Sequence, residues 1–266
     1  MPSIAEAACD VLRTADPAAK AAASRAMAAL WRTGGLTASF DCAPPDRPAR
    51  PDRPCLLPPH KMPKRRKAGS VATRAALLHA IAHIEFNAID LAWDIIVRFG
   101  HAFPVGFIED WVRVADDEAR HFRMLCGRLQ QLGSHYGALP AHDGLWQAAE
   151  ATKGDALARL VVVPMVLEAR GLDVTPGMIA RFEAAGDADS AAALRIILAD
   201  EVSHVAAGRR WFAYICDQNC LDMQACFHKT VTAFYDGQVK GPFNTEARRR
   251  AGMLQDWYEP LWQQGA

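Results

Sequence analysis

The sequence carries no surplus of basic or acidic residues. Its 266 residues include 30 Lys and Arg against 30 Asp and Glu, so the formal net charge is zero when histidine is neutral. Proteins that coat nucleic acid or bind anionic membranes rely on a basic excess. The balance therefore argues against both classes and favours an ordinary globular protein, long enough for a sizeable core.

The sequence also lacks an apolar run that could cross a membrane. The best candidate, residues 157–167, is short and contains Arg159 and Pro164, whereas spanning a hydrocarbon layer takes about 20 residues. The N-terminus carries Glu6 and Asp10 and has no basic segment followed by an apolar one, as a secretory signal would have. We therefore expect no membrane segment and no secretory leader, and a cytoplasmic location.

Cysteine pairs of the CxxC type are absent. The seven cysteines are odd in number, so neither a disulfide framework nor a structural zinc site is expected, and reduced thiols are favoured. Cys216 and Cys220 lie four residues apart on an expected helix and could meet. Packing in the core is nevertheless the favoured interpretation for both thiols.

Signals for β structure are nearly absent, since there is no Asn-Gly hairpin and no sustained alternation of apolar and polar residues. Apolar residues instead recur with helical spacing in four long segments. We predict helices at residues 70–99, 104–132, 155–173 and 188–218. The sequence Thr175-Pro176-Gly177 is expected to break the third helix. Four helices of this length fit an antiparallel bundle.

Segments of different composition flank the predicted bundle. An Ala-rich helical extension is divided by Asp16-Pro17, a natural cap and first-turn pair. A proline-rich strap with polyproline II character follows. It ends in a short basic run, for which solvation is favoured over an anionic partner: Lys61, Lys64, Arg65, Arg66 and Lys67. The predicted parts are the extension (1–42), the strap (43–68), the bundle (69–218) and a C-terminal helical extension packed on it (219–266).

The predicted bundle contains an internal repeat with an offset of 83 residues. Residues 83–90 can be laid over residues 166–173, and residues 117–121 over residues 200–204. Each half then has one Glu on its first helix and the sequence Asp-Glu-x-x-His on its second, with the two glutamates 33 residues apart. The repeat predicts two helical hairpins related by a pseudo-twofold axis.

The repeated acidic and histidine residues form a complete ligand set for two metal ions. Its members are Glu85, Glu118, His121, Glu168, Glu201 and His204. Glu and His three residues apart lie on nearly one helix face, so both can reach one ion. Four carboxylates and two imidazoles are the set found in di-iron and di-manganese bundles. Because four buried negative charges would be prohibitive without cations, we predict two iron ions, with manganese or a mixed pair as alternatives.

Other polar residues near this set have more than one interpretation. Asp117 and Asp200 are predicted to accept a hydrogen bond from the second ring nitrogen of a ligand histidine, across the pseudo-twofold axis. The alternative is that these aspartates face water. His79 and His83 have no counterpart in the second half and are interpreted as core or surface histidines, with extra metal ligands as the alternative. A wider alternative is that the Glu-x-x-His pairs are solvent-facing.

The motifs resemble those of known families. The spacing is similar to that of the ferritin-like superfamily of carboxylate-bridged dinuclear metal proteins. Asp117-Glu118-Ala119-Arg120-His121 resembles the helix motif of its oxygenase branch, although the second copy has Ser203 in place of the arginine. The core and the segment at 240–252 look like an uncharacterised bacterial ferritin-like family, domain of unknown function 455, over about residues 70–252. The resemblance implies the fold, an all-α ferritin-like bundle, and the metal site.

The main functional hypothesis is a non-haem di-iron oxygenase or oxidase. Its expected partners are dioxygen, an electron donor and an unknown small substrate, because the metals would carry the oxidation while the protein supplies geometry and excludes water. Pro164, just before Glu168, removes a backbone hydrogen bond and can kink the helix or open a pocket. Ordinary core packing explains the apolar residues around it equally well.

Two other classes of function stay open. One is iron handling, although the strap and the extensions disfavour a 24-subunit cage, and the other is a metal-bound protein without turnover. The ferritin-like superfamily, which the sequence resembles, includes a tRNA-modifying monooxygenase. A tRNA substrate therefore remains an alternative. The terminal aromatic and basic residues, such as Trp257 and Arg248, could stack bases. Packing of a terminal helix is the favoured explanation for them.

Overall fold

The computed structural model describes residues 1–62 and 68–263, and within these residues the chain is helical. The described part contains two isolated β-bridges and no strand, which confirms the predicted all-α class. Four residues of the predicted basic run, 64–67, lie outside the described residues. The ferritin-like arrangement of four helices stays a prediction.

The chain divides into two compact units. The first contains residues 1–146 and 181–193, and the second contains residues 147–180 and 194–266. Each unit contains three of the six predicted ligands. Glu85, Glu118 and His121 belong to the first unit, and Glu168, Glu201 and His204 belong to the second. The four parts predicted from composition are segments of the sequence and not compact units. The boundaries of these four parts stay a prediction.

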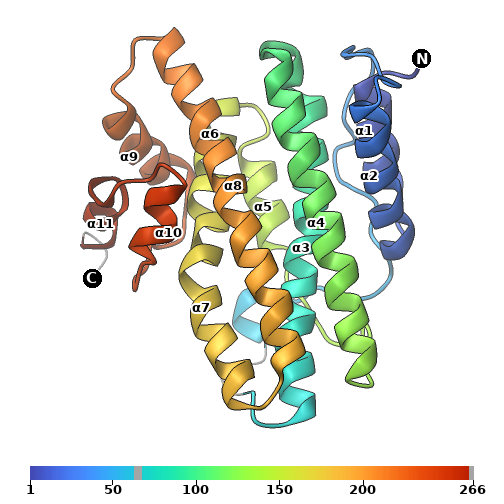
Figure 1. The fold of residues 1–266 in the computed structure, drawn as a ribbon. Helices are drawn as coiled ribbons and strands as arrows, with labels where there is room; N and C mark the ends of the chain where they lie inside the picture. Colours follow the sequence, from blue (N-terminus) through green and yellow to red (C-terminus); the bar gives the residue numbers. More distant parts are fainter. Residues whose placement is uncertain (63–67, 264–266) are drawn as a thin grey trace. The chain divides into compact units, whose positions relative to one another are not determined.

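The first unit is built on two long helices. Helix α3 (Val71–Phe99) and helix α4 (Val105–Gln131) are joined by the short helix η2 (Gly100–Ala102) and pack along each other (Figure 1). Their bounds agree with the predicted segments to within a residue. Ser70 caps α3, where its side chain accepts a hydrogen bond from the Thr73 backbone N–H.

The N-terminal helices belong to the core of this unit. Helix α1 (Ile4–Arg13) packs on α3, and helix α2 (Pro17–Arg32) packs on α4. Asp16 caps α2 with Pro17 in its first turn, as predicted. The fully buried Lys20 places its Nζ 2.5 Å from Oδ1 of the fully buried Asp90. Because isolated buried charges are costly, this ion pair ties the extension to α3.

In its described residues, 43–62 and 68, the proline-rich strap is irregular apart from the short helix η1 (Pro59–Lys61) and an isolated bridge at Leu56. Its backbone pairs with a distant segment, since Leu57 N donates to Ala141 O at 2.8 Å. Arg50 from the strap also reaches α3, where its Nη1 lies 2.8 Å from Asp90 Oδ2. The strap is therefore fixed to the first unit.

The second unit begins with a helical rod of mixed pitch. Helix α5 (Gly144–Ala151) starts in the first unit and leads to α6 (Ala156–Leu160), which Asp155 caps. A π-helical segment, η3 (Val161–Glu168), follows, and helix α7 (Ala169–Ala184) continues the rod. The defect predicted at Pro164 is thus a wider helical turn. Such segments are rare and are frequent at functional sites.

The predicted break at Pro176 is wrong, because α7 runs through this proline to Ala184. A proline inside a helix leaves the carbonyl four residues earlier without its usual donor. That carbonyl belongs to Leu172, and it accepts a hydrogen bond from Asn244 Nδ2 at 3.1 Å instead. A residue far along the chain therefore compensates for the local defect.

The remaining helices complete the second unit. Helix α8 (Ala188–Gln218) has the predicted bounds, although its first six residues belong to the first unit. Helices α9 (Met223–Phe234), α10 (Thr245–Arg250) and α11 (Gln255–Gln263) confirm that the C-terminal segment is helical. Helix α9 packs on η3 and α6, and α11 packs on α9.

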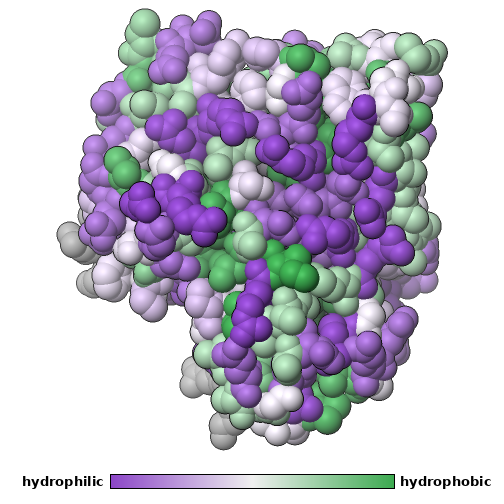
Figure 2. Space-filling model, viewed as in Figure 1, coloured by the Kyte–Doolittle hydropathy of each residue, from purple (hydrophilic) through white to green (hydrophobic). Residues whose placement is uncertain are grey.

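The visible surface is mainly hydrophilic, with small scattered groups of hydrophobic residues (Figure 2). Among the helices of the described residues, none has the length and the apolar character needed to span a bilayer.

Candidate metal centre

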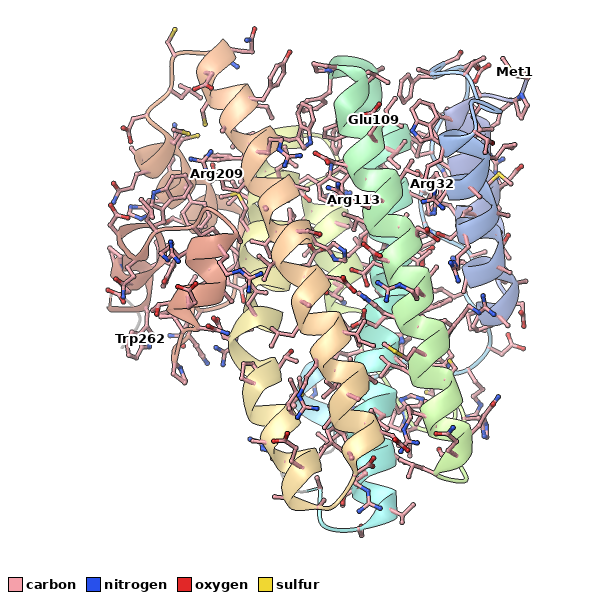
Figure 3. The ribbon with its side chains drawn as sticks, in the orientation of Figure 1. Met1, Arg32, Glu109, Arg113, Arg209 and Trp262 are labelled. Atoms are coloured by element: carbon pink, nitrogen blue, oxygen red, sulfur yellow. The ribbon has the colours of Figure 1, made fainter. Side chains whose placement is uncertain are left out.

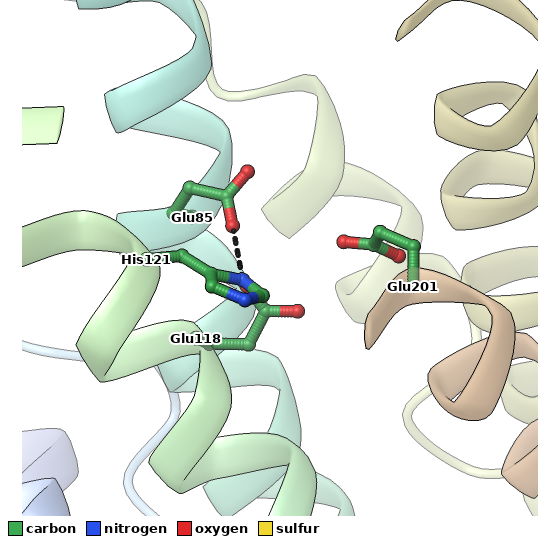
Figure 4. A group of neighbouring side chains, drawn as sticks. All are labelled: Glu85, Glu118, His121 and Glu201. Carbon is green, nitrogen blue, oxygen red and sulfur yellow. Dashed lines mark hydrogen bonds and ion pairs between the residues drawn. The ribbon is translucent and has the colours of Figure 1, made fainter. Parts of the chain in front are cut away.

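Three predicted ligands converge inside the first unit. Glu85 comes from α3, and Glu118 and His121 come from α4 (Figure 4). Their exposed fractions are 2%, 1% and 0%. One ligand atom from each side chain lies within 4.8 Å of the others. The packing of α3 on α4 brings Glu85 to the face that Glu118 and His121 share.

The imidazole of His121 presents one nitrogen to both carboxylates. His121 Nδ1 lies 3.1 Å from Glu85 Oε2 and 3.6 Å from Glu118 Oε2. The first distance is a hydrogen bond and the second is longer. The two carboxylate oxygens and the imidazole nitrogen could instead bind a cation. The cation would replace the proton that His121 and Glu85 share.

Burial and a neighbouring negative charge disfavour the ionised form of Glu85. Burial, followed by the charge of Glu118, holds the pKa of Glu85 well above its ordinary value, and the hydrogen bond to His121 opposes this effect. Glu85 is therefore harder to ionise at this position than in water. A divalent ion would supply the missing positive charge, and an oxygen-rich set with imidazole suits iron or manganese. The residues present fit the predicted metal.

The second unit holds the equivalent pair on α8. His204 is fully buried and Glu201 is 9% exposed, and His204 Nδ1 lies 3.8 Å from Glu201 Oε2. The nitrogen that faces the preceding glutamate is thus Nδ1 in both repeats. Glu168 ends η3 and is partly buried.

Glu85, Glu118, His121 and Glu201 are each buried, and each offers an atom that could bind a metal ion. Figure 4 shows the side chains of all four residues. This group is a possible carboxylate metal site, in agreement with the coarse prediction. The complete set of six ligands, with Glu168 and His204, stays a prediction.

The aspartates that precede the Glu-x-x-His pairs are partly buried. Asp117 Oδ1 accepts a hydrogen bond from Arg120 Nη2 at 3.0 Å, within its own helix. The predicted contacts of Asp117 and Asp200 with the ligand histidines across the pseudo-twofold axis stay a prediction.

His79 and His83 are buried and have partners away from the three converging ligands. His83 Nδ1 lies 2.8 Å from Tyr136 Oη, and its Nε2 lies 3.2 Å from the His142 carbonyl oxygen. Burial and the charge of Arg50 lower the pKa of His83 to about 3, so this imidazole is neutral. His79 Nε2 accepts the Gly137 backbone N–H at 2.9 Å. Both are core histidines, as the favoured interpretation held.

Comparison with known proteins places the chain in a family. The profile described as "Protein of unknown function (DUF455)" matches residues 13–259. The chain belongs to this family. It is also 42% identical over 221 residues to an "Uncharacterized protein" of Haemophilus influenzae, and this match covers 79% of this chain and 75% of that protein. No solved structure matches the chain. The resemblance to DUF455 is confirmed, and the link to the ferritin-like superfamily stays a prediction.

One structural feature of this DUF455 protein was not predicted from the sequence. Both copies of the repeat end in an aspartate, Asp90 and Asp173, whose side chains are fully buried. Each binds an arginine from outside the four predicted helices: Arg50 from the strap, and Arg248 from α10. The sequence does show that the two aspartates occupy equivalent positions in the repeat, which could have indicated a shared role. The arginine partners are visible only in three dimensions.

Proposed function

We propose that this DUF455 protein is a dinuclear, iron-type carboxylate metalloprotein that uses dioxygen to oxidise an organic substrate. In this proposal the half-site of Glu85, Glu118 and His121 and the half-site of Glu168, Glu201 and His204 together hold two ions. The observation that carries it is the buried convergence of the first three residues. The matching order of residues in the second half supports the second half-site.

The residues have distinct roles in this proposal. Glu85 supplies one carboxylate, and burial and the charge of Glu118 raise its pKa, so a cation would bind there in competition with a proton. Glu118 supplies a second carboxylate from the adjacent helix, and His121 supplies Nδ1 toward the same point. When bound, a pair of iron ions supplies two-electron redox chemistry toward dioxygen. The protein holds the ligands and excludes bulk water.

Helix η3 supports the proposal from the second unit. Its apolar residues Val161, Val162 and Met165 are fully buried, which keeps water from the segment that leads to Glu168. The π-helical pitch gives Glu168 an orientation that differs from that in a regular helix. Wider turns of this kind are common at functional sites.

Metal analysis of the protein purified without oxygen tests the ligand assignment. We expect about two iron or manganese ions per chain in the unmodified protein and loss of most of this metal in Glu118→Ala with Glu201→Ala. The matched control is Glu109→Ala, since Glu109 is an exposed glutamate on the same helix α4 (Figure 3). Unchanged metal content in the double variant would refute the assignment.

Oxygen uptake by the reduced, metal-loaded protein tests the activity. We expect consumption of dioxygen that depends on Glu118 and is stimulated by members of a metabolite or tRNA panel. Metal binding without oxygen consumption would contradict the oxidation proposal and favour a non-catalytic role. A 24-subunit particle on size exclusion would favour iron handling instead.

A further inference from the structure

The two copies of the repeat each carry a cavity on the same helix face. In the first unit a strap cavity of about 500 Å³ is lined by His83 and Phe86 of α3 together with strap residues such as Arg50. In the second unit a C-terminal cavity of about 380 Å³ is lined by Val166 of η3, Arg170 of α7 and residues of the C-terminal segment. Val166 is equivalent to His83 in the repeat.

An equivalent Asp–Arg ion pair borders each cavity. Asp90 binds Arg50, which lines the strap cavity, with 2.8 Å between Oδ2 and Nη1. Asp173, equivalent to Asp90, binds Arg248, which lines the C-terminal cavity, through bonds of 2.9 and 2.7 Å. In both units a segment outside the repeat has therefore been fixed over the helix, and a cavity lies beside the fixed arginine.

The polar groups of the two cavities differ in whether they have partners. In the strap cavity, His83 and Tyr136 are hydrogen-bonded to each other. In the C-terminal cavity, Tyr258 is only 1% exposed, and its hydroxyl has no hydrogen-bond partner among the described residues. A buried hydroxyl without a partner costs free energy, so this group is available to a ligand.

The charge of the C-terminal cavity is one-sided. Three basic side chains, Arg170, Lys240 and Arg248, line it, and among the described residues no acidic side chain does. Asp173 neutralises Arg248 from behind, because both of its oxygens bind that guanidinium, and its Oδ2 also lies 3.5 Å from Arg170 Nη1. Arg170 donates to the Lys240 carbonyl oxygen at 2.7 Å, which fixes the loop that covers the cavity. The exposed Lys240 ammonium remains at the rim.

We propose that the C-terminal cavity binds an amphipathic organic acid. The carboxylate interacts with the charges of Lys240 and Arg170 and accepts a hydrogen bond from Tyr258, and the apolar body packs on Met165 and Phe227. The volume lies within the range of small-molecule sites, and few polar groups among apolar ones are typical of them. Guanidinium and hydroxyl donors suit a carboxylate.

This site is separate from the proposed metal ligands. Val166 and Arg170 lie two residues to either side of Glu168, and helical geometry turns residues two apart toward roughly opposite faces. Met165, which also lines the cavity, lies three residues before Glu168, but none of the six proposed metal ligands lines it. The proposal does not depend on the metal centre, and the ligand is not assigned as the substrate.

Calorimetric titration of the full-length protein with octanoate tests the proposal, with octanamide as the neutral probe of the same length. We expect one octanoate per chain and at least roughly tenfold weaker binding of octanamide, since a charged hydrogen bond contributes about that much. Lys240→Gln and Tyr258→Phe should each weaken octanoate binding by roughly three- to tenfold. Thermal unfolding of each variant shows whether it folds.

Equivalent substitutions in the strap cavity provide matched controls. Arg53→Gln and Tyr136→Phe should leave octanoate affinity unchanged, because these residues line only the other cavity. Glu118→Ala should also leave it unchanged, which separates this site from the proposed metal function. Equal affinity for octanoate and octanamide, no binding of octanoate, or equal loss in Arg53→Gln and Lys240→Gln would overturn the proposal.

Discussion

Gly208 of α8 lies directly against Pro164 of η3. A Cβ atom at residue 208 would lie 2.4 Å from Pro164 Cγ and 2.5 Å from its Cβ, which is closer than real atoms approach. Gly208 follows Glu201 by seven residues, or about two helical turns, and Pro164 precedes Glu168 by four. This contact therefore sets the spacing of the two segments that carry the carboxylates of the second unit.

Replacing this glycine tests the importance of the close approach. Gly208→Ala should destabilise the protein by roughly 1 to 3 kcal/mol, because overpacking forces a shift of backbone or ring. Gly171→Ala in α7 is the control, since no heavy atom lies within 4 Å of its added Cβ, and it should be neutral or stabilising. Urea unfolding followed by circular dichroism measures both, and equal effects would contradict the prediction.

The buried ion pair between α2 and α3 makes a second prediction. Lys20→Met leaves Asp90 with Arg50 as its remaining ion-pair partner. Removing one member of a buried pair typically costs about 3 to 5 kcal/mol, and Arg50 should reduce the loss toward the lower value. Urea unfolding measures it. Arg249→Gln, at an exposed ion pair with Glu246, should have no measurable effect, and a similar small effect of Lys20→Met would refute the prediction.

Local signals predicted the helices and the half-site of the first unit. The cap Asp16 and the apolar spacing act within a few residues, so the sequence contains the information that fixes these helices. Glu118 and His121 are three residues apart on one helix, and the repeat identified Glu85 as their partner. Their convergence needed only that α3 and α4 pack side by side.

Long-range contacts set the features that the sequence did not reveal. The helix continues through Pro176 because Asn244 binds the Leu172 carbonyl, and no pattern near Pro176 reports this. Lys20 lies in an Ala-rich helix and resembles a surface lysine until Asp90 is seen beside it. Pro164 predicted a defect in the helix. Its π-helical form is a feature of the folded rod.

The start of α8 makes a prediction about pH. Burial raises the pKa of Asp187, but hydrogen bonds from Ser190 and the charges of Arg128 and Arg74 outweigh it and hold the pKa below 3.8. A carboxyl group with a lowered pKa stabilises the folded state above its unfolded pKa, and the contribution is lost as pH falls through the folded value. Asp187→Asn should therefore lower stability at pH 7.

The pH dependence of that loss is the measurement. The difference in unfolding free energy between the unmodified protein and Asp187→Asn should be constant from pH 7 to about 5. It should shrink as the pH falls below about 3.8, the ordinary value. Asp189→Asn is the control, because the Asp189 side chain is 80% exposed and pairs with the same Arg128. A difference that grows toward acid pH would contradict the assigned direction.

Pro164 is predicted to control the metal site through the pitch of η3. Pro164→Ala restores a backbone N–H that a regular helix uses, so the segment should tend toward α-helical pitch and rotate Glu168 relative to α8. This prediction rests on the proposed ligand role of Glu168. We expect iron affinity to fall at least roughly tenfold while the helical circular dichroism is kept. Pro176→Ala is the matched control, because Asn244 already binds the Leu172 carbonyl. Iron titration of both variants decides it, and equal affinities would show that the proline at 164 has no special effect on the metal site.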